Sequence, residues 1–246
     1  MSTSLSRFAF AFIFSCSTLA TAQTAPPKYK TNLPPSADLA YAIKARQSGL
    51  TINGDARIQW QNDGGKYRVA TEARAMLAGK ILDERSEGAI DAHGLAPAAF
   101  TQKRYRKEAT TTTFDRQARV IRFAGSDKSY PIKGGEQDRG SAMWQLIAVA
   151  RAAPAKFRQG SSWTFFVAGQ RDAEPWTFKV GKQEKIKTPQ GEMTALHVVK
   201  TPPPDSKEQQ IDLWLAPALE WYPVRMRYTD GDGEYIEQTL ESLTRK

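Results

Sequence analysis

The chain has 246 residues, of which 25% are charged and 40% hydrophobic, and its formal net charge is +9. Its single cysteine is Cys16, near the N-terminus. The chain after Cys16 can therefore form no disulfide bond and has no thiolate chemistry. The positive excess favours anionic partners such as lipid headgroups. We expect no nucleic-acid partner, because the N-terminal pattern described next predicts export.

The N-terminus has the pattern of a secretory signal. Arg7 precedes the apolar residues 8–14, and Ala20-Thr21-Ala22 has the small-x-small form of a cleavage site. We therefore predict a signal peptide over residues 1–22, cleaved after Ala22, and a periplasmic protein. No later segment approaches the ~20 apolar residues of a transmembrane helix. Phe14 fits poorly two positions before a lipidated cysteine, which argues against a lipoprotein anchored through Cys16.

Residues 23–36 are rich in Pro, Thr and Lys, and we expect a disordered leader there, followed by a single β-rich domain over residues 37–246. Alternating apolar and polar residues predict strands, separated by turns such as Asn62-Asp63-Gly64-Gly65. The expected strands are residues 39–45, 52–60, 66–76, 80–90, 100–107, 110–114, 119–123, 129–132, 163–167, 176–187, 192–200, 209–215, 224–228 and 234–240.

One long helix is predicted over residues 138–153. Asp138 or Ser141 can accept hydrogen bonds from its first turn, and Pro154 cannot continue it. Apolar residues occupy most of its circumference, so the helix needs cover on more than one side. The fold class is therefore mainly β: an antiparallel curved sheet, or an open or closed barrel of roughly a dozen strands, with this helix packed on the concave face.

The helix offers two interpretations. Its apolar residues either fill the concave face as core, which is the commoner outcome, or leave a gap and cover a ligand. On the second interpretation the candidate ligand-binding residues are Met143, Trp144, Leu146 and Ile147, together with Trp221 and Tyr222, which we expect at the mouth of the sheet.

Basic residues concentrate in one strand and the hairpin that follows it. On a strand, Arg104 and Arg106 lie on one face and Lys103 and Lys107 on the other, so the strand is an edge or a protruding hairpin. The simpler interpretation is that these charges block edge-to-edge association. The functional hypothesis is an anion-contacting surface formed by Lys103, Arg104, Arg106, Lys107, Arg119 and Arg122.

No catalytic or metal-binding motif is evident. Neither His93 nor His197 has a neighbouring signature of acid or base catalysis, and we interpret both as structural. The acidic residues 230–234 resemble the start of a calcium loop, but Tyr235 stands where that loop needs glycine, so a hairpin turn is favoured. We assign no catalytic residue, no metal ligand and no cofactor.

Three segments resemble a known family of exported bacterial proteins, the domain of unknown function 3108. They are Gln137-Asp138 with Ser141, the run Ala216-Pro217-Ala218-Leu219-Glu220-Trp221-Tyr222-Pro223-Val224-Arg225, and Glu237-Gln238-Thr239-Leu240. The likeness covers most of the chain after the signal peptide and implies no activity. The architecture is more loosely similar to the open barrel with a helix of periplasmic lipoprotein carriers, a likeness that does not confer function.

Three functions remain open. The leading hypothesis is a non-enzymatic periplasmic protein whose curved sheet holds an apolar or amphipathic envelope component, such as a lipid or a lipoprotein acyl chain. The alternative is a structural or protein-interaction factor in envelope assembly, with a filled core. The third is a hydrolase that uses unrecognised carboxylates. Empty apolar volume inside the sheet would separate the first from the second.

Overall fold

The computed structural model describes residues 27–202 and 209–246 of the chain. The expected signal peptide lies outside these residues. The described parts form fifteen strands, one α-helix and one short 3₁₀ helix. The elements are β1 (Ala37–Gln47), β2 (Leu50–Asn62), β3 (Lys66–Ala75), β4 (Gly79–Asp91), β5 (Gly94–Arg104), β6 (Thr110–Asp115), β7 (Val120–Phe123), β8 (Ser126–Pro131), β9 (Gln137–Asp138), α1 (Ala142–Ala152), β10 (Ser162–Ala168), β11 (Ala173–Thr188), β12 (Gly191–Lys200), β13 (Gln210–Leu215), η1 (Pro217–Leu219), β14 (Pro223–Thr229) and β15 (Tyr235–Arg245).

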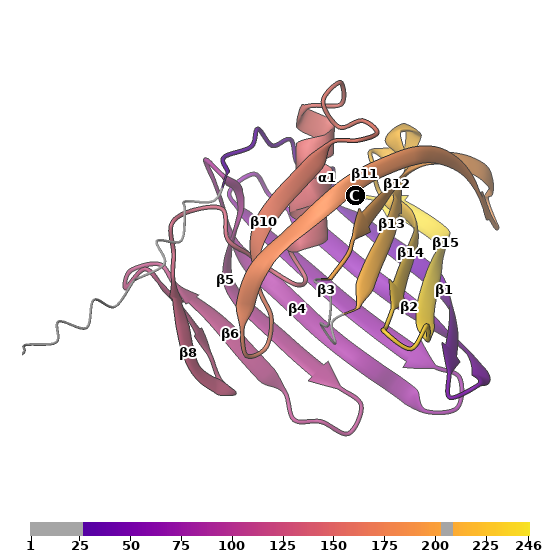
Figure 1. Ribbon diagram of the computed structural model, residues 1–246, viewed down its shortest axis with the longest axis horizontal. Helices are drawn as coiled ribbons and strands as arrows, with labels where there is room; N and C mark the ends of the chain where they lie inside the picture. The colour runs from indigo at the N-terminus through magenta and orange to yellow at the C-terminus, as the bar shows by residue number, and fades with distance from the viewer. Residues whose placement is uncertain (1–26, 203–208) are drawn as a thin grey trace, which may run out of the picture.

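All fifteen strands belong to one curved sheet. Its order runs from β8 back to β1, then from β15 back to β9, so the first and last strands of the chain pair at its centre. Figure 1 shows the two halves of the sheet as two layers, with α1 between them at one end. The expected mainly β fold with one helix is confirmed. The pairing is antiparallel except between β9 and β10, which are parallel.

The sheet does not close into a barrel by strand pairing, because its end strands β8 and β9 do not pair. Side chains instead connect β5 with β9 and α1. Gln145 accepts a hydrogen bond from Leu95 N (2.9 Å) and donates one to His93 O (2.7 Å), and Gln137 donates to Leu95 O (2.8 Å). Two glutamines therefore satisfy backbone groups of Leu95 and of His93, which precedes β5, where no strand pairs with them.

Helix α1 starts four residues later than the sequence predicts. Asp138 Oδ1 accepts hydrogen bonds from Gly140 N and Ser141 N (both 2.8 Å), which holds these residues in a turn ahead of the helix. The helix ends at Ala152, two residues before Pro154. Eight of its eleven residues are buried, which confirms that it is covered on more than one side.

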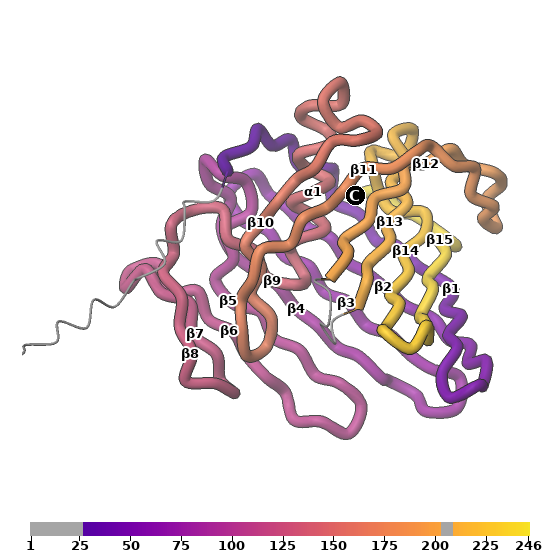
Figure 2. Tube along the Cα trace, in the orientation of Figure 1, coloured from indigo at the N-terminus to yellow at the C-terminus, as the bar shows by residue number. Residues whose placement is uncertain are grey.

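Residues 27–36 belong to the segment that the sequence predicts to be a disordered leader. They form neither helix nor strand, but they cross the end of the sheet beside α1, as the first coloured segment of Figure 2 shows. Asn32 N donates to Ala148 O of α1 (2.9 Å). The Tyr29 ring packs edge-on against Trp163 and Phe165 of β10, with ring centroids 5.1 and 5.7 Å away. These contacts cover apolar surface at the end of the core, which stabilises the segment.

Strand β5 begins six residues before the predicted start at Phe100, although it contains Pro97. The register between β4 and β5 shifts at Gly88, and a β-bulge accommodates the proline. A Cβ on Gly88 would lie only 2.2 Å from Ala96 O, so this bulge requires glycine. Strands β6, β7 and β8 continue past the seam and pack a small second core, including Phe114, against the end of β10.

Candidate functional site

The predicted ligand-binding residues of the helix are core residues. Trp144, Leu146 and Ile147 are completely buried, and Met143 is partly buried. The Trp144 ring stacks on Trp60 of β2, with centroids 4.5 Å apart and planes 8° apart. These side chains fill the concave face of the sheet. None of these four side chains lines either of the two hollows described below.

The other two predicted residues, Trp221 and Tyr222, follow η1 at the mouth of the sheet. Trp221 packs edge-on against Phe157 at 5.3 Å, and Tyr222 packs edge-on against Trp144 at 6.1 Å. Burial raises the pKa of Tyr222 to about 12, and its hydroxyl donates a hydrogen bond to Pro35 O. The structure therefore brings Trp144 and Tyr222 together, as part of the packed core.

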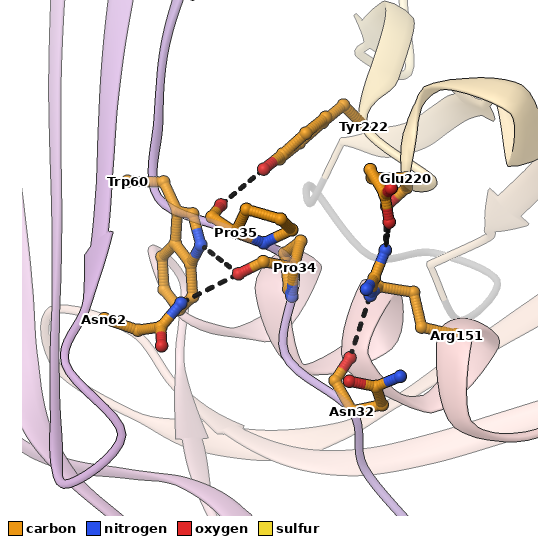
Figure 3. Close-up of polar contacts among 8 residues, drawn as sticks. All are labelled: Asn32, Pro34, Pro35, Trp60, Asn62, Arg151, Glu220 and Tyr222. Atoms are coloured by element: carbon orange, nitrogen blue, oxygen red, sulfur yellow. Dashed lines mark hydrogen bonds and ion pairs between the residues drawn. The ribbon is translucent and has the colours of Figure 1, made fainter. Parts of the chain in front are cut away.

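Residues 32–36 hold the mouth closed through their carbonyl oxygens (Figure 3). Pro34 O accepts hydrogen bonds from Trp60 Nε1 (3.1 Å) and Asn62 Nδ2 (2.8 Å). Arg151, in the last turn of α1, donates to Asn32 O (3.2 Å) and forms an ion pair with Glu220. This extended segment, β2, α1 and the loop after η1 therefore form one connected polar network.

A hollow of about 690 Å³ lies beside this network. Residues 28–32, Ala92 and the end of α1 line it, and its charged lining residues are Lys28, Lys30 and Arg151. The lining contains no carboxylate. Such a hollow can accommodate an anionic group. A second hollow of about 560 Å³ lies at the turn between β2 and β3, with lining charges of both signs.

Asp138 is the most perturbed carboxyl group of the concave side. Its Oδ2 accepts a hydrogen bond from Ser86 Oγ (2.6 Å), whose oxygen lies 3.0 Å from the Tyr67 hydroxyl. Burial raises the pKa of Asp138 to about 7, despite the hydrogen bonds that favour its charged form. Burial also raises the pKa of Glu84. Neither carboxyl group lines either hollow, so neither has substrate space beside it.

The raised pKa of Asp138 predicts a measurable pH dependence of stability. An unfolded aspartate has a pKa of about 3.9, so between about pH 4 and pH 7 the folded form holds a proton that the unfolded form has lost. The contribution of Asp138 to the free energy of unfolding is therefore greatest below the unfolded pKa, and it decreases as the pH rises. From about pH 5 to pH 6.5, this loss amounts to about 2 kcal/mol.

The matched variant is Asp138→Asn, whose amide can keep the contacts with Gly140 N, Ser141 N and Ser86 Oγ. We expect urea unfolding of the wild type to show the loss of about 2 kcal/mol between pH 5 and pH 6.5. In the variant, the free energy of unfolding should lack this loss over the same range. Parallel pH profiles of the two proteins would contradict the raised pKa.

The six predicted anion-contacting residues separate into two groups. Lys103, Arg104, Arg106 and Lys107 are all exposed at the tip of the hairpin between β5 and β6. Arg119 lies at the opposite end of β6, and its guanidinium donates to Ile132 O. Arg122, on β7, forms an ion pair with Asp115 (3.1 Å). The continuous surface expected from both hairpins is therefore not formed.

A polar cluster on the outer face of β11–β14 escaped the sequence analysis. The ring of His197 stacks on Trp214, with centroids 4.6 Å apart. Its Nε2 lies 2.7 Å from Asp212 Oδ1, and its Nδ1 lies 3.5 Å from Glu184 Oε1. Burial acts to raise the pKa of the Asp212 carboxyl group. Hydrogen bonds from His197 and Gln210 act in the opposite direction, and the net result is a lowered pKa. Only strand register brings these residues together, so their spacing in sequence gave no signal.

No group of three or more His, Cys, Asp or Glu side chains suited to a metal ion occurs in residues 27–202 and 209–246. The acidic residues 230–234 form a hairpin turn, in which Asp230 Oδ1 accepts hydrogen bonds from Asp232 N and Glu234 N. No helix within the described residues has the length and apolar character needed to cross a bilayer.

Comparisons with known proteins find one matching family model and several similar solved structures. The family model described as "Protein of unknown function (DUF3108)" matches residues 39–241. No curated protein matches the chain. The chain is similar to the crystal structure of a beta-barrel-like protein of DUF1849 from Brucella abortus, with 16% identity and a TM-score of 0.55, covering 87% of this chain and 99% of that one. A DUF1329 protein from Desulfovibrio piger matches with 7% identity and a TM-score of 0.31, covering 87% and 86% of the two chains.

Proposed function

The chain belongs to the DUF3108 family, and from its filled concave face we propose that it is a non-enzymatic protein of the bacterial envelope that acts through surface contacts. One observation carries this proposal. Trp144, Leu146 and Ile147 are completely buried against the concave face, which supports a core packed where a carrier needs apolar space. Of the functions left open by the sequence, this geometry favours the interaction factor with a filled core.

The cellular location is part of this proposal. Arg7, the apolar run after it and the small residues before Gln23 support export and cleavage after Ala22. The positive net charge supports contact with anionic components of the envelope. The hydrolase alternative loses support, because Asp138 has its oxygens occupied by Ser86, Gly140 and Ser141.

Native mass spectrometry tests the filled core. We expect protein purified from its host envelope fraction, or incubated with phospholipid and fatty acid, to retain the mass of the polypeptide alone. A stoichiometric lipid adduct that survives gentle activation would overturn the proposal. The variant Trp144→Ala is the positive control, because its shortened side chain creates apolar space in the core. A lipid adduct on this variant shows that the assay detects such space.

A second candidate function, carriage of an anionic amphipathic ligand, is favoured by the hollow of about 690 Å³ beside residues 28–32. Its cationic lining suits a phosphate or carboxylate group. On this alternative the lipid adduct forms in the wild type, and Lys30→Gln with Arg151→Gln weakens it. A lipid adduct unaffected by these substitutions would contradict binding in this hollow.

A further inference from the structure

The exposed large hydrophobic side chains gather at one end of the sheet. Within the described residues there are four of them: Leu50 is 67% exposed, Met76 77%, Leu77 99% and Tyr105 45%. Leu50 follows the turn between β1 and β2, Met76 and Leu77 form the turn between β3 and β4, and Tyr105 follows β5. Single exposed hydrophobic residues are common, but the gathering of all four at the tips of successive hairpins is not explained by folding.

Strand register places these three hairpin tips side by side. Met76 N donates a hydrogen bond to Asn53 O of β2 (3.0 Å), and Tyr105 N donates to Ile81 O of β4 (2.8 Å). Two strand spacings of ~4.8 Å separate successive tips by ~10 Å. Figure 1 shows the three hairpins ending along the lower edge of the sheet. We call residues 46–51, 74–80 and 103–108 the hairpin rim.

The hairpin rim is strongly basic. It contains seven lysines and arginines and a single carboxylate, Glu108. The cations are Arg46, Arg74, Lys80, Lys103, Arg104, Arg106 and Lys107. Glu72 and Asp83, just outside the rim, pair with Arg74 and Lys80, so the excess is greatest at the tip between β5 and β6. The acidic turn after β14 lies next to the tip between β1 and β2, which makes the β3–β6 side the positive one.

We propose that the hairpin rim docks on an anionic membrane surface. Met76 and Leu77 enter the headgroup region, while the cations around Tyr105 contact lipid phosphates. This inference rests on the proposed function, because it names the surface through which the protein acts. The apolar tips favour a membrane over a nucleic acid, since a phosphate backbone offers no apolar environment to Leu77. Arg119 and Arg122 lie outside the rim and take no part.

Flotation with lipid vesicles tests the proposal. We expect the mature wild type to bind vesicles of phosphatidylglycerol and phosphatidylcholine at low ionic strength, and to bind vesicles of pure phosphatidylcholine at least ~10-fold more weakly. The variant Lys103→Gln/Arg106→Gln/Lys107→Gln should reduce binding to the anionic vesicles by about 100-fold, at a factor of ~5 for each cation. Met76→Ser/Leu77→Ser should reduce it by about 10-fold and make the remaining binding more sensitive to salt.

The matched control removes three exposed cations elsewhere. Lys179, Lys182 and Lys187 lie on β11, in the half of the sheet remote from the rim hairpins. The variant Lys179→Gln/Lys182→Gln/Lys187→Gln has the same change of net charge, and we expect it to bind within about 3-fold of the wild type. Equal losses in the two triple variants would mean that net charge alone drives binding, which overturns the rim.

A site-specific label tests the orientation independently. The chain after Ala22 contains no cysteine, so Leu77→Cys and Lys182→Cys each give a single attachment point for a polarity-sensitive dye. We expect a blue shift on anionic vesicles for the label at position 77 and none at position 182. Identical responses at the two positions would overturn the orientation.

Two further outcomes distinguish failure of the rim from failure of the proposed function. If the wild type does not bind anionic vesicles and also carries no lipid in native mass spectrometry, only the docking of the hairpin rim is overturned. A stoichiometric lipid adduct overturns the filled-core function itself. Tight binding to a short DNA duplex, unaffected by Met76→Ser/Leu77→Ser, would assign the basic tip to a nucleic acid and also overturn the membrane proposal.

Discussion

Replacing Trp144 by alanine should lower the free energy of unfolding by about 3–5 kcal/mol, which is the usual cost of deleting a buried aromatic ring. The ring is fully buried between Trp60 and Tyr222, so its removal loses the stacked contact at 4.5 Å and leaves a cavity. The surrounding strands belong to one paired sheet and can close this cavity only partly. Urea unfolding, followed by far-ultraviolet circular dichroism, measures the loss.

The neighbouring Met143 supplies the matched control. It is only partly buried, so Met143→Ala should cost about 1 kcal/mol, well below the cost at Trp144. A cost below about 1 kcal/mol for Trp144→Ala would mean that the ring is loosely packed. The concave face would then contain usable space, and the carrier function would regain its support.

Replacing Gln145 by methionine should cost about 2–4 kcal/mol, although the side-chain volume is nearly conserved. The side chain pairs both Leu95 N and His93 O, and its loss leaves these two backbone groups without partners at a buried seam. Each unsatisfied group costs about 1–3 kcal/mol. Hydrogen exchange should additionally show faster exchange of the Leu95 amide, because β6 pairs with β5 only from Ala99 to Gln102 and does not reach Leu95.

The exposed Gln59 of β2 is the control for this substitution. Gln59→Met should change stability by no more than about 0.5 kcal/mol. If Gln145→Met were equally neutral, the seam would depend on apolar packing alone, and the glutamine contacts would not be what holds β5 against α1.

The sequence identified the members of the candidate site better than their arrangement. Periodicity identified Trp144, Leu146 and Ile147 as helix residues that face apolar surroundings, and the structure confirms both features. Whether they line a cavity depends on how closely Trp60 approaches from β2, a contact between residues 84 positions apart. The same limit applies to His197 and Asp212, which meet only through the register of β12 and β13.

The contacts of residues 27–36 are a feature that composition does not indicate. Low hydrophobicity and two successive prolines predict a segment that cannot form its own core. An extended proline-rich backbone has no internal hydrogen bonds, so the carbonyl groups of Pro34 and Pro35 remain available to Trp60 and Tyr222. Those donors come from strand β2 and from the loop after η1, and nothing within the segment itself indicates them.

The basic hairpin between β5 and β6, with which the anion-contact hypothesis began, was indicated by the run of cations in the sequence. The exposure of the four cations agrees with the sequence, but the reason differs in part, because β5 ends at Arg104, and Arg106 and Lys107 lie in the turn that follows. The partners of that hairpin were a matter of tertiary structure. Pairing of β1 to β5 placed Leu50, Met76 and Leu77 on the same edge and Arg119 on the other.

The sequence by itself determined the mainly β class, the single helix and its burial, because these depend on local periodicity and on the turn residues between the strands. The tertiary structure decided that the sheet stays open, that glutamines satisfy its seam, and that the helix fills the concave face. Those outcomes depend on volumes and registers of residues far apart in the chain, which no local pattern encodes.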